Sequence, residues 1–313
     1  MWCQLLIIYF IIAIILFLLL ASYYSYRRTF YISSKQKQAG AHLDASGDLA
    51  IKKHINNMIN KFDAIPSEWV TITAKDGTVL KARYHQIKKG APLHIQFHGY
   101  RGSSSRDFCG GAMLAQSRGH NTLVVEQRAH GKSGGHTVTF GIKEKYDCLS
   151  WIEYASKRFG NDTPIILSGI SMGGATVLMA AKLDLPNNIK GIIVDSPFSC
   201  PVKIIKKVSG SIVKLPPNVV FPIIRLGGLI FGRFDICSSD AFEGVKNNNL
   251  PILIIHGKND NFVPCEMSQE LYEQSISANK TLALFEGADH GLSYIVDPKR
   301  YEHLFDAFIN QIL

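Results

Sequence analysis

The chain has no cysteine pair at the spacing of a metal site, no nucleic-acid-binding motif, and no internal repeat or low-complexity tract. These absences exclude a cysteine-based metal site and a repeat array, and they give no reason to expect a nucleic-acid partner. The cysteines are instead scattered along the 313 residues as Cys3, Cys109, Cys148, Cys200, Cys237 and Cys265. An even number would allow disulfides in an exported protein, but we expect free thiols because the body is expected to face the cytoplasm.

Acidic residues are scarce in one long stretch of the chain. The net charge is +9, and no Asp or Glu occurs between Phe198 and Phe234. The same stretch carries six basic residues, namely Lys203, Lys206, Lys207, Lys214, Arg225 and Arg233. Two interpretations remain open: attraction to anionic lipid headgroups, worth about 1 kcal/mol per basic residue near the surface, or a solvated basic face.

Polar residues are absent from Leu5 to Ala21, which is long enough to cross a bilayer at about 1.5 Å per residue. No Lys or Arg precedes this run, so we expect a retained anchor rather than a cleaved signal peptide. Basic residues follow it at Arg27, Arg28, Lys35 and Lys37, which predicts a single-pass protein with a cytoplasmic body. We expect residues 5–21 to contact lipid, within an anchor at residues 1–26.

Residues 27–65 are expected to form a juxtamembrane connector that ends in an amphipathic helix, where Ile51, Ile55, Met58 and Phe62 recur at helical spacing. Residues 66–313 then predict one α/β domain. A hairpin is expected around Asp76-Gly77, and short apolar runs alternate with helical stretches after it. This alternation predicts a mostly parallel sheet with helices on both faces. The fifty-residue interval at about 198–249 is too long for a connection and predicts a helical cap inserted after the sixth strand.

Chemically active residues follow the predicted strands at four places. These are His98-Gly99-Tyr100, Gly169-Ile170-Ser171-Met172-Gly173, His256-Gly257-Lys258-Asn259-Asp260 and Asp289-His290-Gly291. The carboxyl ends of parallel strands meet at one edge of a sheet, so these residues are expected to converge there.

Ser171 lies in a G-x-S-x-G pentapeptide between a strand and an Ala-rich helical segment. The glycines permit a strained turn that exposes the serine at the start of the helix. A serine hydroxyl needs a base to remove its proton and an acid to orient that base. His290 and Asp260 fit these roles, because serine, acid and histidine follow one another in the order expected when three strand ends meet.

These motifs resemble the α/β-hydrolase superfamily over roughly Trp69 to Leu313, and within it bacterial membrane-anchored serine hydrolases of the serine aminopeptidase-like and monoacylglycerol-lipase-like group. The resemblance implies Ser171 as nucleophile, Asp260 of HGKNDNFVP as acid and His290 of GADHG as base. It also implies an oxyanion hole formed by the backbone N–H groups of Tyr100 and Met172. The stretch EQRAHGKS is similar to the family's D-x-R-G-H-G-x-S loop, with Glu126 and Ala129 at the departures, and is interpreted as structural.

Two other carboxylates compete for the role of the acid. Asp195 ends a predicted strand, at a position that some family members use, and Asp289 adjoins His290 in sequence. Neighbouring side chains on an extended loop tend to diverge, which disfavours Asp289. His98, His130 and His256 are expected to bond the backbone in turns.

The sequence therefore predicts a membrane-anchored serine hydrolase that needs no metal or organic cofactor. Its expected substrates are carboxylic esters with an apolar acyl or alkyl group, cleaved through an acyl-enzyme on Ser171. A peptidase of small amides or peptides is one alternative. A non-catalytic hydrolase-like adaptor at the membrane is another, although its usual mark, a missing nucleophile, base or oxyanion turn, is not found.

Overall fold

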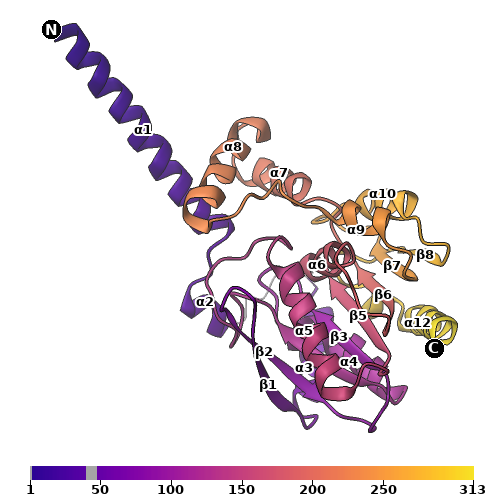
Figure 1. Ribbon diagram of the computed structural model, residues 1–313. Helices are drawn as coiled ribbons and strands as arrows, with labels where there is room; N and C mark the ends of the chain where they lie inside the picture. Colours follow the sequence, from indigo (N-terminus) through magenta and orange to yellow (C-terminus); the bar gives the residue numbers. More distant parts are fainter. Residues whose placement is uncertain (1, 40–47) are drawn as a thin grey trace.

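The computed structural model describes residues 2–39 and 48–313, and its centre is an eight-stranded sheet (Figure 1). The strands are β1 (Glu68–Thr73), β2 (Val79–His85), β3 (Leu93–Phe97), β4 (Asn121–Glu126), β5 (Ile165–Ile170), β6 (Ile189–Asp195), β7 (Ile252–Gly257) and β8 (Lys280–Phe285). Their spatial order is β1-β2-β4-β3-β5-β6-β7-β8. The β1–β2 hairpin is antiparallel, as is the β2–β4 pairing, and all other pairings are parallel. The predicted mostly parallel sheet is confirmed.

Helices cover both faces of the sheet, as predicted. One face packs against α5 (Glu144–Phe159), α6 (Met172–Ala180), α9 (Ala241–Asn247) and α10 (Glu266–Gln274). The other face packs against α4 (Ser104–Ser117) and α12 (Pro298–Ile312), with the short α11 (Ser293–Val296) beside them. Buried strands have apolar residues on both faces, which explains the nearly continuous apolar runs in the sequence.

The amphipathic helix expected near the end of the connector is α3 (Leu49–Asp63). Its N-cap residue, Asp48, accepts hydrogen bonds from the backbone N–H groups of Ala50 and Ile51. Met58 and Phe62 are buried against α4, so this helix packs on the body. A short helix, α2 (Ser34–Ala39), precedes it, and residues 40–47 of the expected connector lie outside the described residues.

The expected cap lies between β6 and β7. It contains α7 (Pro201–Ile212), α8 (Pro217–Gly227), the π-helical segment η1 (Gly228–Gly232) and then α9. Several of its basic residues have protein partners: Lys203 pairs with Glu270, and Arg225 pairs with Asp235. Lys207 donates to the carbonyl oxygens of Asn261 and Phe262. Lys203 and Lys207 therefore join the cap to the rest of the body, and Arg225 pairs within the cap. Both interpretations of the basic stretch stay predictions.

The apolar N-terminal segment forms a single helix, α1 (Trp2–Thr29), which projects from the body (Figure 1). Its side chains are exposed from Trp2 to Leu20. Its last turns instead pack on the cap, where a side chain at Gly227 would lie 2.4 Å from the carbonyl oxygen of Ser22. Tyr26, Phe30 and Ile32 are buried in a cluster with Phe140 and Phe234. The body thus incorporates residues that the sequence assigned to the anchor and the connector.

Candidate active site

Ser171 lies in a sharp turn between β5 and α6. Its backbone has φ 53° and ψ −116°, a conformation rare for a residue with a side chain. Its N–H donates to the carbonyl oxygen of Asp195, 2.9 Å away. The flanking glycines make the turn possible: a Cβ at Gly173 would stand 1.7 Å from the carbonyl oxygen of Phe97, and one at Gly169 would meet the backbone of Gly173 at 2.3 Å. The sequence pattern therefore reflects backbone contacts that no larger residue allows.

Asp260 and His290 are brought together from the ends of β7 and β8. The Nδ1 atom of His290 lies 2.7 Å from Oδ2 of Asp260. The other carboxylate oxygen accepts hydrogen bonds from the N–H groups of Phe262 and Val263, at 2.9 and 2.7 Å. Burial by itself would raise the pKa of Asp260, but hydrogen bonds from His256 and His290 hold that pKa well below its ordinary value. A permanently ionised Asp260 is suited to orienting the imidazole ring of His290.

His256 reinforces this arrangement. Its Nε2 atom lies 2.9 Å from the carbonyl oxygen of Val263 and 3.1 Å from Oδ2 of Asp260, and its Nδ1 atom lies 2.6 Å from Oγ of Ser268. The ring is fully buried. His256 therefore bonds the backbone, as expected from the sequence, and in addition fixes the carboxylate beside His290.

The competing carboxylates have other partners. Asp195 accepts hydrogen bonds from the hydroxyls of Ser196 and Ser293, at 2.9 and 3.3 Å. Asp289 accepts from the backbone N–H groups of Asn261 and His290. Burial raises the pKa of Asp195 to about 6, despite the hydrogen bond from Ser196 and the nearby His256 and His290. The geometry thus favours Asp260 as the partner of the His290 ring.

The turn His98-Gly99-Tyr100 follows β3 and lies beside Ser171. The N–H of Gly99 donates to Oδ2 of Asp107 on α4, 2.7 Å away, which fixes this turn. A Cβ at Gly99 would lie 3.3 Å from Cβ of Ser171, so the turn and the serine are in close contact. Met172 begins α6, and the first N–H groups of a helix have no acceptor within it. Tyr100 and Met172 thus both lie close to Ser171, and the use of their backbone N–H groups as an oxyanion hole stays a prediction.

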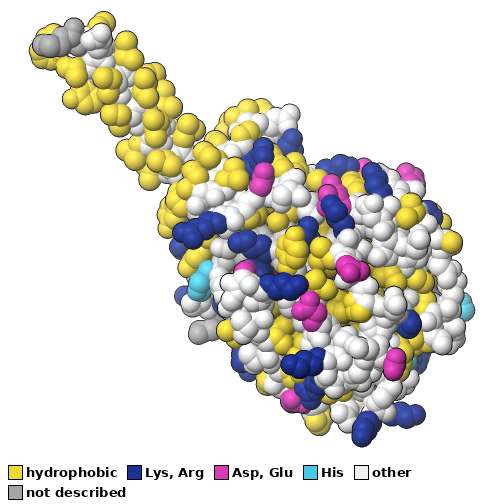
Figure 2. Space-filling view, viewed as in Figure 1, with side chains coloured by type: hydrophobic (Ala, Val, Ile, Leu, Met, Phe, Trp, Pro, Cys, Tyr) yellow, Lys and Arg dark blue, Asp and Glu magenta, His cyan; other side chains and the backbone are white. Residues whose placement is uncertain are grey.

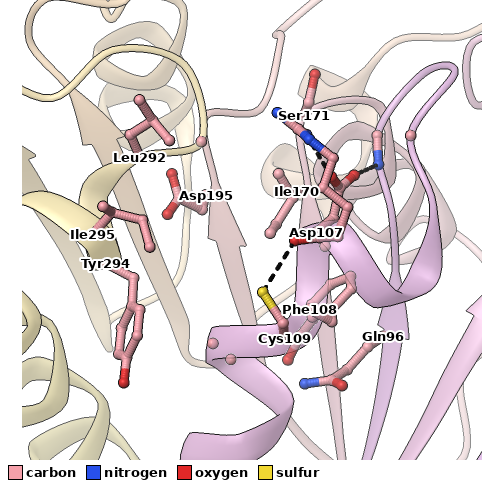
Figure 3. Close-up of a pocket in the computed structure, with 18 of the residues that line it drawn as sticks. Gln96, Asp107, Phe108, Cys109, Ile170, Ser171, Asp195, Leu292, Tyr294 and Ile295 are labelled. Atoms are coloured by element: carbon pink, nitrogen blue, oxygen red, sulfur yellow. Dashed lines mark hydrogen bonds and ion pairs between the residues drawn. The ribbon is translucent and has the colours of Figure 1, made fainter. Parts of the chain in front are cut away.

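Two cavities meet at Ser171. One, of about 90 Å³, contains Ser171 and His290 at its edge and extends beneath α4 to Gln96, Asp195 and Tyr301. Figure 3 shows Asp195 and Leu292 on one side of it, with Ile170, Asp107 and Cys109 on the other. Oε1 of Gln96 is buried without a hydrogen-bond partner among the described residues. This cavity offers polar groups close to the serine.

The second cavity, of about 370 Å³, is mainly apolar and lies under the cap. Ser171, Tyr100 and Phe262 line its inner end, while Ile205 and Ile224 of the cap helices line its side. The cap therefore places an apolar groove directly over the serine, a position suited to the hydrocarbon part of a substrate. Among the described residues, no group of three or more His, Cys, Asp or Glu side chains is arranged to hold a metal ion.

Known proteins share this architecture. Residues 95–220 match a family described as the alpha/beta hydrolase fold, and residues 237–294 match one described as serine aminopeptidase, S33. The chain has the α/β-hydrolase fold. An esterase of Pyrococcus furiosus, Pf2001, superimposes with a TM-score of 0.65 at 22% identity, over 80% of this chain and 92% of the esterase.

Two proteins of named organisms are similar to this chain in sequence. YqkD of Bacillus subtilis is 26% identical over 194 residues, which cover 62% of this chain and 63% of YqkD. The membrane protein YNL320W of Saccharomyces cerevisiae is 28% identical over 183 residues, 57% of each chain. The chain thus spans less than two thirds of the length of either relative.

The EQRAHGKS loop has structural contacts. Arg128 is buried and forms 2.6 Å ion pairs with both oxygens of Asp147. The ring of His130 bonds the backbone of Arg101 and Arg128, and the ring of His98 bonds the backbone of Gly99 and Gln127. Burial lowers the pKa of both histidines, which favours their neutral forms. The interpretation of these two histidines as turn residues agrees with the structure.

Sequence reasoning missed Asp107, which holds the turn at Gly99, and the contact of His256 with Asp260. Asp107 lies in the first turn of α4 and carries no motif of its own. Its role depends on how α4 packs beside β3. A signal for His256 was present, since it stands four residues before Asp260, but the loop geometry that joins them was not evident from sequence.

Proposed function

We propose that this protein is a membrane-anchored serine hydrolase that cleaves carboxylic esters with an apolar acyl or alkyl group. The principal support is the meeting at one cavity of Ser171, in its strained turn, and His290, held by Asp260. The esterase-like fold and the apolar groove under the cap add to that support.

The proposed reaction begins with the neutral His290, whose Nδ1–H donates to Asp260 and whose Nε2 accepts the proton of Ser171. The serine oxygen then bonds to the ester carbonyl carbon, and the N–H groups of Tyr100 and Met172 stabilise the negative oxygen that develops. The alcohol leaves with the proton from His290. Water, deprotonated by His290, next attacks the acyl-enzyme, and the carboxylic acid departs as the proton returns to Ser171.

The location of the enzyme is part of the proposal. We propose that α1 spans the membrane through residues 5–21, since its side chains there are apolar and, as far as Leu20, exposed. Arg27 and Arg28 follow the span, which favours a cytoplasmic body under the positive-inside rule. A reporter fused after Leu313 tests this topology: cytoplasmic behaviour supports it, and an externally accessible reporter contradicts it.

A fluorophosphonate probe tests the catalytic proposal, because it labels only an activated serine. We expect the folded wild type to be labelled, Ser171→Ala and His290→Ala to lose labelling, and Ser117→Ala, at an exposed end of α4, to keep it. A folded wild type that is not labelled contradicts the proposal that the protein is a serine hydrolase and favours the non-catalytic adaptor. The match of residues 237–294 to a serine aminopeptidase family supports a second candidate, amide hydrolysis. A panel of matched esters and amides separates the two activities.

A further inference from the structure

The turn between the two cap helices carries an unpartnered apolar surface. The chain bends by 116° between α7 and the segment formed by α8 and η1, and together these are apolar enough to pass as a broken membrane span or a re-entrant loop. The side chains of Ile212, Leu215 and Val219 are 71%, 55% and 56% exposed, and Val213 is also exposed. We call these four residues the cap tip. Water-exposed apolar side chains gathered in one place indicate a contact surface.

The cap tip and α1 are fixed relative to each other. The rings of Tyr23 on α1 and Phe231 on η1 pack edge to face with centroids 5.1 Å apart, and Tyr26 also contacts Phe231. Gly227 allows α8 to approach the backbone of α1 at Ser22. Figure 1 shows α8 rising beside the foot of α1, with the α7–α8 turn on the side toward which α1 projects. Any membrane that contains α1 is therefore close to the cap tip.

Interfacial residue types surround this region. Tyr23 and Tyr24 are exposed on α1 just after its apolar span, and Arg27 and Arg28 follow one turn later. Tyrosine and basic residues are enriched at the boundary between lipid tails and headgroups. Lys214 adds an exposed basic residue within the α7–α8 turn. Figure 2 shows hydrophobic side chains on the cap beside the foot of α1, with Lys and Arg beneath them. This pattern is complementary to an anionic leaflet.

The apolar groove joins this boundary to the serine. Tyr24, Arg28, Ile212 and Val213 line its outer part, from α1 and the cap tip, and Ser171 lines its inner end. A molecule in the leaflet therefore has an apolar path to the nucleophile between the anchor and the cap. Substrates dissolved in water have no need of such a path.

We propose that the cap tip inserts into the leaflet that holds the foot of α1, so that ester substrates enter the groove directly from the bilayer. The substrate class is a lipid ester resident in the membrane, whose acyl chain lies between α1 and the cap while its carbonyl reaches Ser171. This inference rests on the proposed esterase function and membrane anchor. It assigns to the cap a role in membrane contact as well as in lining the site.

Paired variants test the inference in the full-length protein, reconstituted in vesicles of phosphatidylcholine and phosphatidylglycerol. The test variant is Leu215→Gln with Val219→Gln, which changes the apolar surface without altering charge and leaves the groove lining intact. The matched control is Ile87→Gln with Ile276→Gln, two exposed apolar residues outside the cap. Each is assayed on a long-chain ester in the vesicle and on p-nitrophenyl acetate in water.

We expect the test variant to lose at least tenfold in rate on the vesicle-borne ester and to stay within twofold of wild type on the soluble ester. The control should match wild type on both. Equal vesicle rates for the test variant and the control would overturn the inference, with soluble activity still supporting an esterase. A wild type that hydrolyses neither ester instead contradicts the proposed function.

A second measurement is independent of catalysis. With the exposed Cys3 and Cys237 changed to Ser, an environment-sensitive fluorophore is attached at Leu215→Cys or, as the control, at Ile276→Cys. Lipids with spin labels on the upper acyl chain should quench the fluorophore at position 215 and leave the one at position 276 unaffected. Equal, weak quenching at the two positions shows that the cap tip lies outside the leaflet and overturns the inference.

Discussion

The phenol of Tyr100 donates a hydrogen bond to the carbonyl oxygen of Thr29, 2.8 Å away, and so joins the turn beside Ser171 to the last residue of α1. Burial raises the pKa of this phenol to about 12, so it remains a neutral donor at physiological pH. The next residue, Arg101, donates to the carbonyl oxygen of Arg28. The end of the proposed anchor and the proposed oxyanion turn are thus in direct contact.

Tyr100→Phe should test this contact, since it removes only the phenol oxygen. We expect a loss of about 1 kcal/mol in the free energy of unfolding, the usual net value of one buried hydrogen bond. The rate on a soluble ester should fall a few fold, because the backbone N–H of Tyr100 is proposed to donate to the oxyanion. Thermal unfolding in detergent and kcat measure the two effects. Unchanged values of both would show that the contact has no energetic role.

Asp107 is expected to position the turn that carries the proposed oxyanion donor Tyr100, without itself contacting the reacting atoms of the substrate. Asp107→Ala should lower kcat by about tenfold to a hundredfold with little change in KM, because a misplaced oxyanion donor weakens only the transition state. Asp107→Asn should recover most of the rate, since its amide oxygen still accepts from the N–H of Gly99. Failure of Asn to rescue would assign Asp107 a role that depends on its charge.

Gly173 should tolerate no side chain. Gly173→Ala places a methyl group 1.7 Å from the carbonyl oxygen of Phe97, so β3 or α6 must shift. We expect a severe loss of activity and of folded protein, measured by fluorophosphonate labelling and thermal unfolding. Gly111→Ala is the control, because its nearest neighbour would lie 3.6 Å away, an ordinary contact. Similar behaviour of the two variants would contradict the close packing at the turn.

Asp260→Asn and Asp195→Asn should separate the acid from its rival. Asp260→Asn should reduce kcat by several orders of magnitude, because His290 loses the carboxylate that orients its ring and stabilises the imidazolium formed during the reaction. Asp195→Asn should keep activity within a few fold, since the amide oxygen still accepts from Ser196 and Ser293. The opposite ranking of the two variants would assign Asp195 as the acid.

Asp195→Asn also has an expected pH signature. The pKa of Asp195 in the folded protein, about 6, lies above the ordinary value of 3.8. The folded state therefore binds this proton more tightly, and stability falls as pH rises from about 4 to 6. The variant should lack this loss. Above pH 6 its free energy of unfolding should therefore rise relative to that of the wild type by up to about 3 kcal/mol. Chemical unfolding at pH 4 and pH 7 measures the difference, and an equal gap at both values would contradict it.

Chain-length preference tests the apolar groove over Ser171. Each buried methylene contributes about 0.8 kcal/mol, so four of them should raise kcat/KM by up to roughly a hundredfold. We expect p-nitrophenyl esters to improve from acetate to octanoate. A flat or falling series would exclude an acyl-binding role for the groove while leaving the proposed nucleophile and base unaffected.

Much of the sheet and the arrangement at its edge could be predicted from the sequence. Ser171 and Asp260 follow buried apolar strands and His290 follows the edge strand β8, and parallel strands bring such positions together whatever the helices do. The glycines around Ser171 also indicate the local backbone geometry, since each stands where a Cβ would clash with neighbouring backbone atoms. These features depend on short segments and on sheet topology, which are strongly encoded in apolar patterns.

Contacts between distant helices could not be predicted in the same way. Lys207 belongs to a basic stretch that suggested a charged face, yet it donates to the carbonyl oxygens of Asn261 and Phe262, more than fifty residues away. Asp107 and Gly99 are close in sequence, but their hydrogen bond depends on the placement of α4. Such hydrogen-bond partners are determined by tertiary packing, and no local sequence pattern predicts them.

The burial of Tyr26 and Phe30 determines where the chain can be shortened. Phe30 packs edge to face on Phe234 with centroids 5.0 Å apart, and Tyr26 hydrogen-bonds Thr137 at 2.7 Å. Removing the whole of α1 (Trp2–Thr29) to obtain a soluble enzyme would therefore delete Tyr26 and leave Phe30 as the first residue of the chain, so we expect aggregation rather than solubility. A truncation that starts at Ser22 retains these aromatic rings, and the boundary between a removable tail and an indispensable part of the fold lies within a single helix.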